Sequence, residues 1–259
     1  MSVQEKVRWG ILGCAAVAAK AMVPGIIRSQ NGCVEAVAEE YPPGSKLQKA
    51  KEFAKEFDVE KAFASYDELL DDPNVQAVYL AQPNHLHATW TIQAAEKGKH
   101  VYCEKPLACS TAEAEEMVDV CQKQGVLLMV GYAHRFQPQN RKAKQLIKEG
   151  RIGKVLSIFA THSGSMPAPG NIRLEKKFGG GTLMDRGSYC VNIARYIFQS
   201  EPLSVWASAK FMNGGQGVDK EIVAVLSFPG GQTLQFTSGF SMPDGNYCQS
   251  YEIVGQTGR

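Results

Sequence analysis

The sequence predicts an α/β protein with two parts. Residues 1–131 are expected to form a doubly wound parallel sheet of the Rossmann type, and residues 132–259 a second α/β domain with a mostly antiparallel open sheet. Two observations predict this fold class. Short apolar runs alternate with helical segments in the first half, which is typical of βαβ units, whereas longer alternating runs follow one another in the second half. No internal repeat or low-complexity linker interrupts the chain.

In the first half, strands are predicted at residues 7–12, 34–38, 75–80, 100–103 and 126–130, and helices at 14–30, 45–57, 85–97 and 112–124. Ser45 suits the N-cap of the second helix. Ser110, followed three residues later by Glu113, makes a capping box ahead of the fourth helix. A turn after each element gives the chain the order of a parallel sheet with crossover helices.

In the second half, a helix at 138–148 precedes predicted strands at 154–163, 203–211, 222–228, 233–240 and 251–254. Pro229, Gly230 and Gly231 between two of these runs predict a hairpin. Three glycines at 179–181 precede the one long helix of this half, predicted at 185–198.

Composition excludes several classes of protein. The 28 basic and 26 acidic side chains nearly cancel and are scattered, so neither a nucleic acid nor a membrane surface is an expected partner. No apolar run is long enough to span a bilayer and the first residues do not resemble a signal peptide, so a cytoplasmic protein is expected. The seven cysteines lack a Cys-x-x-Cys pair, which predicts small buried residues and no metal site.

The turn after the first strand carries a variant of the dinucleotide fingerprint: Gly13, Cys14, Ala15 and Ala16 lead into a helix, with alanine in place of later glycines. Small residues there let the backbone approach a pyrophosphate at the helix N-terminus. A tight strand-to-helix turn without a ligand is the alternative. Glu39 favours the cofactor interpretation, because it ends the second strand about 20 residues further on, where a ribose hydroxyl acceptor belongs.

Two further turns lie at the carboxyl ends of predicted parallel strands, the rim where such sheets bind ligands. The first holds residues 82–87, in which His85 and His87 could also be ordinary residues of a first helical turn. The second holds Glu104, Lys105 and Pro106, where the proline ends the strand and fixes the lysine at the rim. A solvated surface lysine is the alternative.

These residues resemble the glucose–fructose oxidoreductase, inositol dehydrogenase and rhizopine-catabolism family, written Gfo/Idh/MocA. The shared motifs run the length of the chain: residues 9–13, Pro83-Asn84 with His87, Glu104-Lys105-Pro106, the 131–138 stretch with Arg135-Phe136, and Gly179-Gly180-Gly181 leading to Asp185 and Gly187. The resemblance implies that nicotinamide dinucleotide is held by Gly13, Cys14, Ala15, Ala16, Glu39, Glu40, Gln82, Pro83, Asn84, His87, Glu104, Lys105 and Arg135. It implies that substrate is bound by Lys105, Arg135, Asp185 and Tyr189.

Three departures from the family pattern are informative. Tyr189 and Asn192 stand where many members have histidine and aspartate, which resembles the glucose–fructose oxidoreductase and dimeric dihydrodiol dehydrogenase branch and implies that Tyr189 transfers the proton. A buried core tyrosine is the alternative. Glu39-Glu40 replaces a common Ser-Arg pair and should repel a 2′-phosphate, so NAD is expected, with NADP possible. The family continues past the strand at 251–254, so the second domain is expected to be C-terminally short.

The resemblance therefore implies an NAD(P)-dependent oxidoreductase acting on a sugar or polyol, with Lys105 and Tyr189 as the catalytic pair. Tyrosine has an ordinary pKa of about 10, and a nearby lysine would lower that pKa enough for proton transfer. A homo-oligomer formed through the C-terminal sheet is also expected. The alternatives are a dihydrodiol or carbonyl reductase of the same family and a non-catalytic dinucleotide-sensing protein.

Overall fold

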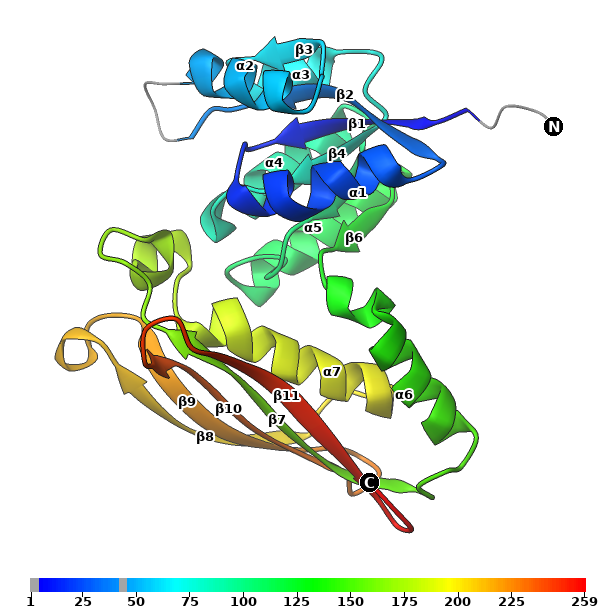
Figure 1. Cartoon of the computed structure of the whole chain (residues 1–259), viewed down its shortest axis with the longest axis vertical. Coiled ribbons are helices and arrows are strands. Elements are labelled where there is room, and N and C mark those ends of the chain that lie inside the picture. The colour runs from blue at the N-terminus through cyan, green and yellow to red at the C-terminus, as the bar shows by residue number, and fades with distance from the viewer. Residues whose placement is uncertain (1–4, 42–45) are drawn as a thin grey trace. The chain divides into compact units, whose positions relative to one another are not determined.

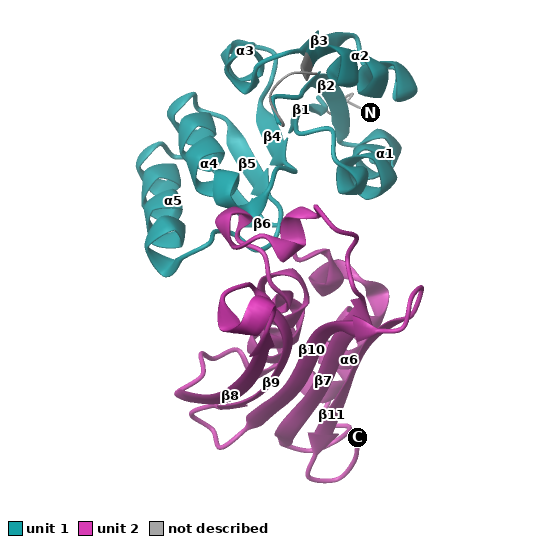
Figure 2. Ribbon diagram, turned by 90° about the vertical axis from the view of Figure 1, so that its left-hand side faces the viewer, with its two compact units in different colours: residues 1–131 teal, residues 132–259 magenta. Residues whose placement is uncertain are grey.

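The computed structural model describes residues 5–41 and 46–259 and divides the chain into two compact units, Met1–Gly131 and Tyr132–Arg259 (Figure 2). Ser45, the predicted N-cap, lies outside the described residues. Among the residues described, no helix combines the length and the apolar character needed to cross a bilayer.

Unit 1 is built on a six-stranded sheet with the order β3-β2-β1-β4-β5-β6, in which every pairing is parallel (Figure 1). Its strands are β1 (Val7–Leu12), β2 (Gly32–Ala38), β3 (Lys61–Phe63), β4 (Ala77–Leu80), β5 (His100–Cys103) and β6 (Leu128–Val130). Its helices are the π-helical η1 (Ala18–Met22), α1 (Val23–Arg28), α2 (Lys46–Glu56), α3 (Tyr66–Asp71), the 3-10 turn η2 (Asn84–Leu86), α4 (His87–Glu96) and α5 (Thr111–Lys123).

Helices cover both faces of this sheet, which explains why the central strand β4 is apolar and buried at every position. One core packs α3, α4 and α5 against the sheet through residues such as Leu69, Trp90 and Met117. The other packs η1, α1 and α2 through residues such as Ile26 and Phe53. Half of the predicted capping box is present: the Ser110 hydroxyl accepts a hydrogen bond from the amide of Glu113 at 3.2 Å, whereas the Glu113 carboxylate accepts from the amide of Cys109 at 2.8 Å.

Unit 2 contains a five-stranded sheet with the order β11-β7-β10-β9-β8. Its strands are β7 (Val155–Ser165), β8 (Ser204–Phe211), β9 (Asp219–Ser227), β10 (Thr233–Met242) and β11 (Tyr247–Gly255). Its helical segments are η3 (Ala133–Phe136), α6 (Pro138–Lys148), η4 (Ile172–Leu174), η5 (Lys176–Phe178), the π-helical η6 (Leu183–Gly187), α7 (Ser188–Phe198) and η7 (Asn213–Gly215).

The second sheet is mixed and mostly antiparallel: only β7 and β10 pair in parallel. The predicted hairpin at Pro229 to Gly231 joins β9 to β10. Residues of α7, such as Cys190 and Ala194, pack on the buried side of the sheet with Ile158 and Leu234. The predicted fold class is confirmed. The prediction missed β3 and α3.

Candidate active site

The turn after β1 has the conformation that a dinucleotide fingerprint requires. Gly13 has a φ of +101°, and a Cβ atom there would lie 3.3 Å from the backbone of Ala81. This backbone conformation disfavours any residue with a side chain. The helix begins at Ala16, so the small residues Cys14 and Ala15 form the approach to its N-terminus.

Glu39, predicted to bind the ribose, is only 3% exposed and accepts four hydrogen bonds from within unit 1. One carboxylate oxygen, Oε1, accepts from the amide of Tyr41 at 2.9 Å and from the hydroxyl of Tyr66 at 3.1 Å. The other, Oε2, accepts from the amide of Cys14 at 3.1 Å and from the ammonium of Lys49. The carboxylate therefore joins the fingerprint turn to the end of β2, and Lys49 balances its charge.

Glu40 has a different position. Its carboxylate accepts a hydrogen bond from the amide of Tyr66, the first residue of α3, at 3.1 Å. A carboxylate at a helix N-terminus satisfies an otherwise unpaired amide. Glu40 thus has a structural partner of its own, and its part in cofactor binding stays a prediction.

Predicted site residues also meet at the carboxyl end of β4. The imidazole of His87, fully buried, lies 2.8 Å from the carbonyl of Pro106 through Nδ1 and 3.0 Å from the carbonyl of Gln82 through Nε2. His87 therefore links the loop of Pro83 and Asn84 to the loop of Lys105. Burial lowers its pKa, against the opposing effect of these carbonyls.

The Glu104 side chain shapes the loop that carries Lys105. One carboxylate oxygen accepts from the fully buried hydroxyl of Tyr79 at 2.7 Å, and the other accepts from the amide of Lys105 at 3.1 Å. Burial followed by the charge of Glu104 raises the pKa of Tyr79, so this tyrosine stays protonated and donates. The peptide bond between Lys105 and Pro106 is cis. Glu104 thus holds the backbone from which the predicted catalytic lysine projects.

The residues of unit 1 fit a bound dinucleotide. Gln82 is 6% exposed, yet neither polar atom of its carboxamide has a hydrogen-bond partner among the described residues. Buried amides without partners cost free energy, and a ligand would supply the missing bonds. Gly13 keeps a side chain out of the adjoining turn. This edge of the sheet therefore has a backbone turn without a side chain at Gly13 and, at Gln82, a buried carboxamide without hydrogen-bond partners.

In unit 2, the three glycines allow close backbone packing before α7. A Cβ atom on Gly180 would lie 2.5 Å from the carbonyl oxygen of Arg173. One on Gly181, whose φ is +110°, would overlap the carboxylate of Asp219. That carboxylate accepts from the amide of Leu183 at 2.7 Å and so caps the helical segment that begins there.

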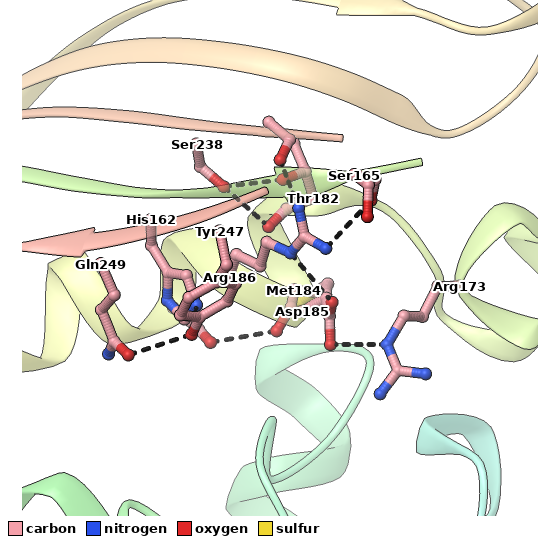
Figure 3. Close-up of polar contacts among 12 residues, drawn as sticks. His162, Ser165, Arg173, Thr182, Met184, Asp185, Arg186, Ser238, Tyr247 and Gln249 are labelled. Carbon is pink, nitrogen blue, oxygen red and sulfur yellow. Dashed lines mark hydrogen bonds and ion pairs between the residues drawn. The ribbon is translucent and has the colours of Figure 1, made fainter. Parts of the chain in front are cut away.

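Asp185, predicted to bind substrate, lies between two arginines (Figure 3). Its Oδ1 atom accepts from Nε of Arg173 at 2.9 Å, and its Oδ2 atom is 3.6 Å from Nε of Arg186. Arg186 in turn donates to the carbonyls of Gly239 at 2.5 Å and Ser165 at 3.3 Å. Asp185 thus connects the loop of Arg173 to the sheet, and substrate binding by Asp185 stays a prediction.

Arg135 is tied to the helix that carries Tyr189. Its Nε donates to Oδ1 of the buried Asn192 at 2.8 Å, and its guanidinium lies 5.4 Å from the ring centre of Tyr196. An asparagine at 192 therefore has a clear structural use. The predicted contacts of Arg135 with substrate and cofactor stay predictions.

Tyr189 lines a cavity of about 460 Å³ within unit 2. Its ring centre lies 5.2 Å from that of His134, 5.0 Å from that of His162 and 5.8 Å from that of Tyr132. Other polar lining residues are Gln137, Gln139, Asn140, Thr161, Gln249, Ser250 and Tyr251. A polar cavity of this size can hold a small hydrophilic ligand.

Sequence reasoning missed both histidines beside Tyr189. Burial and the neighbouring Arg135 lower the pKa of His134 to about 4, which keeps this imidazole neutral at neutral pH. His162 is 4% exposed and faces the helix-covered side of the sheet. The available signal was a histidine at an inward position of an alternating strand, where apolar residues are the rule. Within the described part of the chain, no cluster of three metal-ligating side chains is present.

Comparison with known proteins gives a consistent result. Residues 7–132 match the family model "Oxidoreductase family, NAD-binding Rossmann fold", and residues 140–259 match "GFO/IDH/MocA C-terminal domain". The chain is 33% identical to a D-xylose 1-dehydrogenase (NADP(+)) of Haloferax volcanii over 252 residues. This match covers 97% of this chain and 74% of that protein.

Two solved structures are also similar. An aldose-aldose oxidoreductase from Caulobacter crescentus, complexed with glycerol, is 32% identical with a TM-score of 0.87 and covers 97% of this chain and 75% of that one. A 3-ketoreductase from Actinomadura kijaniata, in complex with NADP and TDP-benzene, is 30% identical with a TM-score of 0.87 and covers 97% and 74%. The chain thus spans about three quarters of the length of these proteins. From its fold, its fingerprint turn and these matches, the chain belongs to the GFO/IDH/MocA family of NAD(P)-binding oxidoreductases.

Proposed function

We propose that this chain transfers hydride between a nicotinamide dinucleotide and a carbon that bears a hydroxyl group in a sugar or polyol. The observation that carries the proposal is Tyr189, whose side chain lines a polar cavity in the unit matched by the family's C-terminal domain. Relatives named for xylose and aldoses, one of them complexed with glycerol, support this substrate class.

The chain's own residues divide the work as follows. Gly13 and the start of the following helix would hold the pyrophosphate, and Gln82 would contact the bound dinucleotide. When bound, the nicotinamide supplies or accepts the hydride. Tyr189 would take or return the hydroxyl proton, and Lys105 would assist by its positive charge. The proposal requires that both residues act on one substrate molecule.

A cofactor-reduction screen of aldoses, inositols and diols tests the substrate class. On the best substrate, Tyr189→Phe is expected to lower turnover by about 100-fold or more while cofactor binding survives, because only the hydroxyl is removed. Tyr196→Phe is the matched control on the same helix and should retain turnover. Lys105→Met should cause a similar loss, and the two losses should not add, since residues that act as a unit are non-additive. Near-normal turnover by Tyr189→Phe would contradict the assignment.

We further propose that the chain binds NAD(H) more tightly than NADP(H). The buried carboxylate of Glu39 supports this preference, because it would repel a 2′-phosphate. Lys49 offsets part of that charge, so Lys49→Met should weaken NADP(H) binding more than NAD(H) binding. Glu40→Gln, which removes the second carboxylate of the pair but can keep the hydrogen bond to the start of α3, should narrow the preference. Fluorescence titration with both cofactors measures each ratio, and equal wild-type affinities would refute the preference.

Cytoplasmic location and a homo-oligomer through the second sheet also stay part of the proposal. Light scattering of the purified protein tests the oligomer directly.

A further inference from the structure

Three polar side chains form a hydrogen-bonded row in unit 2, and two of them, His162 and Gln249, line the cavity. His162 on β7 and Gln249 on β11 are cross-strand partners in the sheet register. Tyr247 lies two residues before Gln249 and so faces the same side of the sheet. The Tyr247 hydroxyl lies 2.5 Å from Nε2 of His162 and donates to Oε1 of Gln249 at 3.0 Å (Figure 3).

The direction of these hydrogen bonds follows from counting protons. A tyrosine hydroxyl has one proton, and here it goes to the carbonyl oxygen of Gln249. With the proton of His162 on Nε2, the imidazole donates to the oxygen of Tyr247. Burial raises the pKa of Tyr247, so its hydroxyl keeps that proton at neutral pH. The hydrogen bonds of this row then all point in the same direction, from the buried imidazole of His162 to the exposed carboxamide of Gln249.

The far end of this row is available to a ligand. In the part of the chain that the structure describes, the Gln249 amide nitrogen donates no hydrogen bond, whereas the carbonyl oxygen of the same carboxamide accepts one. Gln249 and Tyr189 line the same cavity, and the His162 ring is 5.0 Å from the Tyr189 ring. The row thus runs from beside the proposed proton-transfer group to another part of the cavity wall.

We propose that Gln249 is a specificity-determining residue that binds a second hydroxyl group of the substrate, and that His162 and Tyr247 are positioning residues that fix its carboxamide. A hydroxyl group can accept from the amide N–H and donate to the carbonyl oxygen, so it matches both ends of the carboxamide. The inference rests on the proposed function and narrows its substrate to molecules with at least two hydroxyl groups.

Steady-state kinetics of Gln249→Leu test this inference. The variant is expected to raise KM for a polyhydroxylated substrate about 2- to 13-fold, which corresponds to one net hydrogen bond, and to leave kcat within about twofold. For an analogue that lacks the second hydroxyl, KM should not change. Gln235→Leu is the matched control, because Gln235 lies on the opposite face of the same sheet. Equal KM values for Gln249→Leu and wild type on every substrate would overturn the inference.

The positioning roles have their own readout. Tyr247→Phe should raise KM for the polyhydroxylated substrate as Gln249→Leu does, and the double variant should be no worse than either single one. His162→Gln keeps an N–H donor and should preserve KM, whereas His162→Leu should raise it. A merely structural role would instead lower thermal stability and change kcat to the same extent for both substrates. That result would overturn the positioning roles.

Failure of the proposed function gives a different result. If the wild type turns over no sugar or polyol with either cofactor, the proposed function fails, and calorimetric titration with the same polyols still tests the inference. Polyol binding that Gln249→Leu weakens and Gln235→Leu does not would support it. Absence of polyol binding, or equal binding by both variants, would overturn it.

Discussion

Replacing Glu39 with glutamine should destabilise unit 1 although the side chain keeps its size. The carboxylate has two oxygens that each accept two hydrogen bonds, from Tyr41 and Tyr66 on one side and from Cys14 and Lys49 on the other. A glutamine has only one such oxygen, and its amide nitrogen must face one of the two pairs of donors. In Glu39→Gln, the new amide N–H groups therefore face N–H or O–H donors of neighbouring residues in a buried site.

The less costly orientation fixes the magnitude. With the amide nitrogen beside Tyr41 and Tyr66, the Tyr66 hydroxyl can rotate and accept, but the amide of Tyr41 cannot. One N–H then loses its partner, which costs about 1–3 kcal/mol. The loss of charge opposite Lys49 adds little, because that side chain is 42% exposed and solvent screens it. The free energy of unfolding should fall by about 1–3 kcal/mol in total.

Thermal unfolding followed by tryptophan fluorescence measures this change, since Trp9 and Trp90 both lie in unit 1. At about 2–4 °C for each kcal/mol, the melting temperature should fall by about 2–12 °C. Glu56→Gln, on the exposed end of α2, is the matched control and should melt like the wild type. A Glu39→Gln protein as stable as this control would refute the hydrogen-bond count.

Three further predictions concern other parts of the chain. Gly13→Val should abolish NADH binding in a fluorescence titration, because a β-branched residue at φ +101° is strained and fills the turn; wild-type affinity would place the phosphate site elsewhere. Gly181→Ala should lower the stability of unit 2 by roughly 1–3 kcal/mol in urea unfolding, for strain at φ +110° and overlap with Asp219; an unchanged midpoint would contradict this. Because burial lowers the pKa of His134 from 6.5 to about 4, its stabilising contribution is complete above pH 6.5 and is lost as pH falls towards 4. His134→Gln should lose less stability over that interval than the wild type, and parallel pH curves would refute the assignment.

Sequence patterns predicted most elements of the fold and missed two of the short ones. The three-residue β6 was predicted because it lies in a continuous apolar run, whereas the three-residue β3 begins with a lysine, and the six-residue α3 is too short for a period of 3.6 to be visible. The parallel pairing of β7 with β10 was equally hidden, since the segments are far apart in the chain and only tertiary packing brings them together. The hairpin at Gly230, by contrast, is local and was predicted correctly.

The candidate site shows the same division. The turn at Gly13 is a local conformation, and the motif predicted it. Three of the four partners of Glu39, namely Cys14, Lys49 and Tyr66, come from other segments that no local pattern connects to it, so these hydrogen bonds could not be foreseen. His162 and Gln249 are neighbours only because of the register between β7 and β11.

The strand order of the two sheets has a consequence for synthesis on the ribosome. In unit 1 each new strand from β4 onward is added beside its predecessor or beside β1, so that sheet can assemble as the chain emerges. In unit 2, β7 is flanked by β10 and β11, which are made only after β8 and β9. Pairing of distant segments is slow, because a long loop must close first. We therefore expect unit 1 to fold during translation, before β7 can pair with β10 and β11. Until residue 255 has been synthesised, the backbone hydrogen-bond donors and acceptors of β7 can pair with a wrong strand.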